Sequence, residues 1–231
     1  MLRRASLERL IGGTVRARAV RVLRDRIVTG DIPAGTRIDL DALTEEFGTS
    51  RTPIREALLQ LSFEGLVSIA PRSAITVVGM TPEDMLDSFE ILATLSGRAA
   101  EWAATRANGD EIDELRASAR ATADLPPDPG AIVEANWAFH RAVNNAARSV
   151  RLRNHLRLAV QVVPSNFFEV FPDHEQHLVS EHFDLVEAIA SRDAPLAHEI
   201  AAQHVRRAGT ALADWLATRQ PSADAVMPHE H

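Results

Sequence analysis

The segment TSRTPIREALLQL, residues 49–61, places two arginines at the start of an expected helix. Arg51 and Arg55 are four residues apart, so they lie on one side of that helix together with Thr52. Ser50 fits the N-cap position. A helix N-terminus attracts phosphate, and arginine can bind guanine through two hydrogen bonds. Taken alone, such a helix more often presents two solvated arginines; the turn that precedes it and the hairpin that follows it favour a DNA-binding surface.

A second group of residues has the chemistry of a metal site. Asn136 and His140 are four residues apart and project from one face of one helix, and His182 and His204 fall on two later helices. Three imidazoles and one oxygen ligand suit a divalent metal ion such as zinc or nickel. Spacing alone leaves open a second interpretation, in which these are separate polar residues of a helical core.

The elements that must position the arginines are predicted from local signals. Residues 14–29 form an amphipathic helix pattern, DLDALTEEFG is a shorter helix ending at Gly48, and the third helix ends before Gly65. The segments LVSIA and AITVV, joined by PRS, predict a β-hairpin. This order of helices, turn and hairpin is that of a winged helix-turn-helix.

The histidines belong to a segment that is helical in pattern throughout. It begins at GMTPEDM, where Thr81 fits an N-cap and Pro82 the first helical position. We expect helices at 82–107, 110–123, 130–147, 149–170, 175–192 and 195–218, with Pro164 kinking or splitting the fourth. The predicted fold is mainly α, with an N-terminal winged helix-turn-helix and a C-terminal all-helical bundle of six or seven helices. The predicted domains are 1–78 and 79–220, followed by a disordered tail at 221–231.

Charge is divided unevenly between these segments. Residues 1–78 carry 12 Arg and 9 Asp+Glu, a net charge of +3, whereas residues 79–231 carry 13 Arg and 23 Asp+Glu, a net charge of −10. A mildly basic segment can meet a polyanion that an acidic one would repel. The asymmetry favours two domains with different partners.

The N-terminal segment resembles a known family. LRDRIVTGDIPAGTRI and LTEEFGTSRTPIREALLQLSFEGLV are similar to the DNA-binding domain of GntR-family bacterial transcription regulators, including the SRTPxREAL signature. The resemblance implies that Ser50, Arg51, Thr52 and Arg55 contact double-stranded DNA. The family usually has a glycine at the wing tip, where this chain has Ala74; Arg72 is then the expected wing contact.

The C-terminal segment resembles the FCD-type effector domain of the FadR subfamily through NWAFHRAV, EHFDLVEAIASRD and HEIAAQHVRRA. The resemblance implies a metal held by Asn136, His140, His182 and His204, with Asn136 in place of the family's aspartate, and a carboxylate effector completing the metal's ligands. A second departure lies on the first helix, where Leu92 and Ser96 replace the arginine and glutamate of the family's R-x-x-L-E.

Composition excludes several other classes. The chain has no cysteine, no run of 18 apolar residues and no signal-peptide core, which fits a cytoplasmic protein without a membrane partner.

The favoured function is a dimeric, metabolite-responsive repressor that binds a palindromic operator and is not an enzyme. Two alternatives are a metal-dependent hydrolase using Glu134 or Glu181, for which no H-E-x-x-H motif exists, and a regulator whose helical domain only dimerises.

Overall fold

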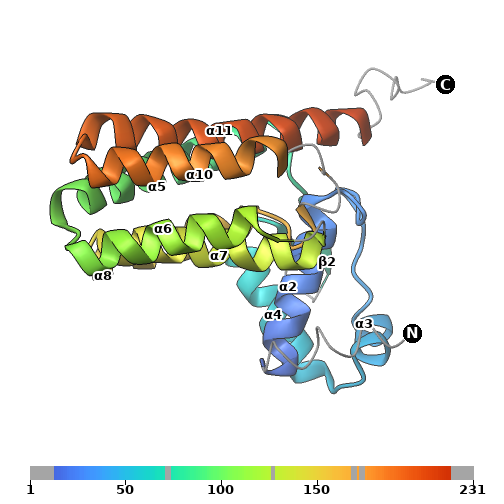
Figure 1. Ribbon diagram of the computed structural model, residues 1–231. Helices are drawn as coiled ribbons and strands as arrows, with labels where there is room; N and C mark the ends of the chain where they lie inside the picture. Colours follow the sequence, from blue (N-terminus) through green and yellow to red (C-terminus); the bar gives the residue numbers. More distant parts are fainter. Residues whose placement is uncertain (1–12, 71–73, 126–127, 168–170, 172–174, 220–231) are drawn as a thin grey trace. The chain divides into compact units, whose positions relative to one another are not determined.

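The structure is a computed structural model that describes residues 13–70, 74–125, 128–167, 171 and 175–219 (Figure 1). It is mainly helical and divides into two compact units, with the break between Met80 and Thr81. The prediction of a winged helix-turn-helix followed by a helical bundle is confirmed. The expected tail at 221–231 and the expected wing contact Arg72 lie outside the described residues.

The first unit contains helices α2 (Val15–Val28), α3 (Leu40–Phe47) and α4 (Arg51–Phe63), then strands β1 (Val67–Ile69) and β2 (Ile75–Val77). The side chains of Thr14 and Asp39 accept hydrogen bonds from backbone N–H groups in the first turns of α2 and α3, respectively, which explains where these helices begin. The strands pair antiparallel with Val67 opposite Val77. The Ala70 N–H donates to the Ala74 carbonyl at 2.9 Å and continues the hairpin beyond the strands.

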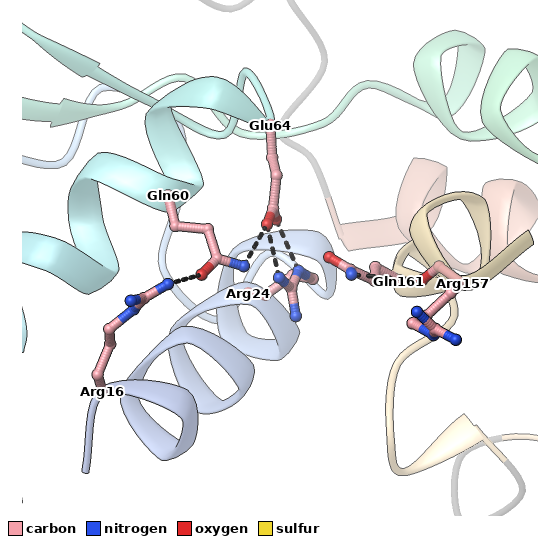
Figure 2. A network of polar contacts seen from close by, with 6 residues as sticks. All are labelled: Arg16, Arg24, Gln60, Glu64, Arg157 and Gln161. Carbon is pink, nitrogen blue, oxygen red and sulfur yellow. Dashed lines mark hydrogen bonds and ion pairs between the residues drawn. The ribbon is translucent and has the colours of Figure 1, made fainter. Parts of the chain in front are cut away.

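An apolar stripe of α4 forms part of the core of the first unit. Ile54, Ala57, Leu58 and Leu61 are all fully buried, and α4 packs against α2. A polar network also joins these two helices: Arg24 donates two hydrogen bonds of 2.7 Å to Glu64, and Gln60 accepts from Arg16 at 3.2 Å (Figure 2). The face of α4 opposite this stripe is therefore left to solvent.

The second unit contains α5 (Pro82–Arg106), α6 (Gly109–Ala123), α7 (Pro129–Ala146), α8 (Val150–Ala159), the 3₁₀ turn η1 (Val160–Val162), α10 (Glu175–Ala190) and α11 (Ala194–Arg219). Two of the helix starts are capping boxes, Thr81 with Asp84 and Asn108 with Glu111. Its long helices run along a common direction, with α5, α10 and α11 in one layer and α6 and α7 in another (Figure 1). None of the described helices is long and apolar enough to cross a membrane.

The fourth predicted helix, 149–170, is interrupted before Pro164, as expected from that proline. The α-helix ends at Ala159, η1 follows, and the residue before the proline is pushed out of the helical region. Val163, which precedes Pro164, has an extended backbone with φ −78° and ψ 116°. The residues that follow α8, Val160, Val163 and Pro164, line a cavity of the second unit.

The helices α5 and α11 approach closely at a glycine. A Cβ placed on Gly209 would lie 2.5 Å from the Cβ of Phe89. Only glycine fits this contact, and it places the Phe89 ring between the two helices, at the wall of the same cavity.

Candidate DNA interface and metal site

The turn between α3 and α4 sets the direction of the arginine-bearing helix. Gly48 ends α3 with φ 60° and ψ 46°, a left-handed conformation that side chains disfavour. Three residues, Gly48, Thr49 and Ser50, then join α3 to α4. Because the apolar stripe of α4 is buried, Arg51, Thr52 and Arg55 are all exposed on its outer face.

Ser50 occupies the N-cap position of α4 but its side chain makes no capping hydrogen bond. A capping side chain accepts from the second or third helical N–H, and the third residue here is Pro53, which has none. The Ser50 hydroxyl is exposed at the helix start. It can therefore donate to a phosphate oxygen beside the N-terminal N–H groups.

Arg51 is paired with an acid of α3. Its Nε and Nη2 donate to the two carboxylate oxygens of Asp41, each at 2.7 Å, and its side chain is 64 % exposed. These are two of the donors that a guanidinium uses to bind guanine. Asp41 and DNA would therefore compete for Arg51, an effect that sequence reasoning did not identify.

Arg55 differs from most arginines of the first unit. Contacts within the unit engage Arg18, Arg24 and Arg26, whereas Arg55 has no hydrogen bond or ion pair with any residue that the structure describes. It is one helical turn from Arg51. Of the two arginines at the start of α4, Arg55 is thus the more available to an external partner.

The second site brings together the three histidines predicted from the sequence. His140 of α7, His182 of α10 and His204 of α11 each offer a ring nitrogen, and these atoms lie within 4.8 Å of one another. The ring centroids of His140 are 5.4 Å from His182 and 5.1 Å from His204. Residues more than 60 positions apart in the chain therefore form one cluster.

Several atoms of this cluster are buried without a hydrogen-bond partner among the described residues. Both ring nitrogens of His182 and the Oδ1 of Asn136 are inaccessible to water, and none of them bonds to a residue that the structure describes. The His182 ring stacks on Phe139, with centroids 3.8 Å apart, which fixes its plane. Buried polar atoms are almost always satisfied, so these atoms point to a group that would bind them.

Glu181 orients His204. Its carboxylate Oε2 lies 2.5 Å from His204 Nδ1, and its Oε1 lies 2.6 Å from the guanidinium of Arg207. A carboxylate on Nδ1 favours the tautomer whose lone pair is on Nε2. The sequence named Glu181 only as a candidate general base; its role as an orienting group comes from the pairing of α10 with α11.

The cluster also favours neutral rings. Burial lowers the pKa of His140 to about 3, with a further contribution from the charge of His204. Burial likewise holds the pKa of His182 well below its ordinary value, assisted by His140 and His204. Neutral imidazole is the form that binds a metal ion.

A cavity of about 590 Å³ adjoins the histidines within the second unit. Asn136, His140 and His204 line it together with apolar side chains such as Phe89, Leu92 and Val205. Cavities of this size accept small metabolites. His182 is not among the residues that line this cavity.

A winged helix-turn-helix followed by a helical unit with such a cavity defines a class, the DNA-binding transcriptional regulators. Residues 16–77 match the family described as "Bacterial regulatory proteins, gntR family", and residues 87–207 match the FCD domain. The chain belongs to the GntR family and carries an FCD domain. Its DNA-binding domain implies DNA as a partner, and its FCD domain implies a small-molecule effector.

Known relatives support this assignment. The chain is 26 % identical over 206 residues to the probable D-xylose utilization operon transcriptional repressor of Paenarthrobacter nicotinovorans, covering 87 % of this chain and 90 % of that protein. It is 26 % identical to the transcriptional repressor GlaR of Escherichia coli K12, covering 80 % and 90 %. These names describe transcriptional regulators and not enzymes.

Solved structures share the fold. Escherichia coli McbR/YncC matches with a TM-score of 0.64 and 19 % identity, covering 90 % of this chain and all of that one. A GntR regulator from Rhodococcus sp. RHA1 matches with a TM-score of 0.56 and 20 % identity, covering 85 % and 96 %. At these identities the likeness concerns the fold alone.

Proposed function

We propose that the protein is a metabolite-responsive repressor that binds a palindromic operator as a dimer, and that a divalent metal in its helical unit helps to bind a carboxylate effector. The observation that supports metal and effector binding is the histidine cluster. Both ring nitrogens of buried His182 lack a hydrogen-bond partner among the described residues. The relatives named as repressors support the sign of regulation.

The DNA contacts are proposed to come from the start of α4. Ser50, Arg51, Thr52 and Arg55 are exposed there and surround a helix N-terminus that carries a partial positive charge. One half-site per protomer follows from the way a recognition helix enters the major groove. Arg72, between the two strands, is proposed as a wing contact.

The residues present fit a metal ion such as zinc or nickel. His140, His182 and His204 would hold it, Asn136 would add its amide oxygen, and Glu181 keeps the His204 ring in place. When bound, such an ion supplies positive charge and an open coordination position for an effector oxygen. Asn136 is uncharged, so the site keeps one more positive charge than an aspartate would leave it.

Effector binding can regulate the protein only if the effector prefers one conformational state of the protein. In a repressor, the preferred state is the one with lower affinity for the operator. We therefore expect the metal-loaded protein to release its operator when a suitable organic acid is added.

Two measurements test the proposal. Elemental analysis after incubation with zinc or nickel should find about one ion per protomer; no bound metal would favour a helical domain that serves only in dimerisation. Selection of binding sites from random DNA with the full-length protein should return an inverted repeat. A selected motif without two-fold symmetry would contradict the dimeric operator.

A further inference from the structure

The cavity beside the histidines is lined by positive charge. Arg141 of α7 and Arg153 and Arg157 of α8 contribute to its wall, and among the described residues no aspartate or glutamate does so. The local sequence shows the same bias, because residues 135–168 contain five arginines and no acid. This contrasts with residues 79–231 as a whole, where 23 acids outnumber 13 arginines.

Within the described part of the chain, these cavity arginines lack the carboxylate partners that other arginines of the unit have. Arg148 pairs with Glu111 and Arg206 with Glu90. The Arg153 guanidinium donates, among the described residues, only to the amide oxygen of Asn145, at 3.3 Å. Its guanidinium therefore keeps donors that an anionic ligand could use.

Arg157 is in a similar position one turn further along α8. Its Nη1 lies 3.5 Å from the amide oxygen of Asn154, and its backbone carbonyl accepts a hydrogen bond from Gln161 (Figure 2). Because Arg153 and Arg157 are four residues apart, they share one face of the helix. That face is the one that reaches the cavity.

The arginine pair lies at a distance from the histidine cluster. Arg153 contacts Asn145, which follows His140 by five residues on α7. At about 1.5 Å per helical residue, this places the contact roughly 7 Å along the helix axis from His140. The cavity wall thus carries polar groups at two separate positions along α7, with apolar side chains such as Leu92 and Phe167 also in the wall.

We propose that Arg153 and Arg157 bind a second anionic group of the effector, so that the protein responds to an elongated organic acid with an anionic group at each end. This inference rests on the proposed function, because the first anionic group is the one expected at the histidine cluster. From α5, Leu92 and Ser96 line the same cavity without charge. Recognition of the far group therefore falls to α8.

The test compares matched ligands on zinc-loaded, full-length protein by calorimetric titration. The pairs are glutarate with valerate, adipate with hexanoate, and 3-phosphoglycerate with glycerate. The better-fitting acid with two anionic groups should bind about tenfold or more tightly than its partner with one, since hydrogen bonds between charged groups are stronger than those between neutral groups. The pair that shows the preference tells whether the far group is a carboxylate or a phosphate.

Substitutions identify the residues responsible. Arg153→Gln and Arg157→Gln should each remove most of the dianion preference and leave monoanion affinity unchanged. Arg151→Gln is the matched control, since Arg151 is exposed on the same helix and does not line the cavity. Equal affinities within every pair, or no binding of any probe, would overturn the inference while leaving zinc binding intact.

The proposal of a metal site can be disproved without disproving the second anionic site. If zinc does not bind, the same pairs are titrated against metal-free protein. A dianion preference that depends on Arg153 would still support the second anionic site, and its absence would overturn it.

Discussion

The two candidate sites are held in different ways. The arginines of α4 come from one helix, are exposed, and are ordered by a single short turn at Gly48. The histidines come from three helices; His182 and His204 are buried, and the His182 ring packs on Phe139. An exposed site of the first kind can lose one side chain and keep part of its function. A buried cluster depends on the packing of every helix that contributes to it.

The largest expected effect is the loss of a buried ligand. His182→Ala should lower zinc affinity by more than about 100-fold, because changing groups that merely orient a ligand already costs 10–100-fold. Competition with a chromophoric chelator measures this. His182→Leu, which restores most of the side-chain volume, should lose zinc equally.

His155→Ala is the control for this prediction, since His155 is an exposed histidine of α8. It should bind zinc as the unaltered protein does. Normal zinc affinity in both His182 variants would show that the cluster is a set of core histidines rather than a metal site.

The exposed site should respond in a graded way. Arg55→Ala should weaken operator binding by about tenfold per half-site. A lost bidentate base contact costs about 1–3 kcal/mol, and this loss corresponds to the lower part of that range. Fluorescence anisotropy at several salt concentrations measures it. Arg55→Lys keeps the charge but not the two parallel hydrogen bonds, so it should retain the salt dependence and lose specificity.

Equal affinity of Arg55→Ala and unaltered protein for the selected operator would remove Arg55 from the interface. A loss of the same size on all DNA sequences would instead make it a phosphate contact.

The sequence predicted the first site better than the second because its signals are local. The stripe of Ile54 and Leu58, the glycine at 48 and the following hairpin all lie within about 30 residues, and the helices and strands begin and end within two residues of the prediction. In the bundle, the expected interruption of the fourth helix at Pro164 is found, but the helical pattern did not show how far upstream α8 would end. The helix α8 is ten residues long.

For the histidines, residue types and spacing left a metal site as one of two interpretations, since spacing says nothing about how three helices pack; the resemblance to a family favoured it. Glu181 shows the limit most clearly. It precedes His182 in the sequence but contacts His204, 23 residues later, through the pairing of α10 with α11. The cavity arginines depend in the same way on how α7 and α8 meet.

Glu181 gives a smaller prediction for the buried site. Glu181→Gln should lower zinc affinity by about tenfold, because the amide holds His204 less firmly than a carboxylate does. Asp184→Asn, an exposed acid of α10, is the control and should change nothing. The metal-free variant should melt near the unaltered protein; a zinc affinity that does not fall would show that Glu181 serves only its ion pair with Arg207.

The smallest effect on operator affinity is expected from the ion pair between Asp41 and Arg51 at the exposed site. Asp41→Asn should raise operator affinity by up to about fivefold, since an exposed ion pair contributes about 0–1 kcal/mol and its loss releases Arg51 for DNA. Glu45→Gln, an exposed acid of the same helix, controls for the change in charge. In an Arg51→Ala background the Asp41 substitution should have little effect, because its partner is gone. If Asp41→Asn still raises operator affinity in the Arg51→Ala background, Asp41 acts by repelling phosphate. The ion pair would then not compete with DNA for Arg51.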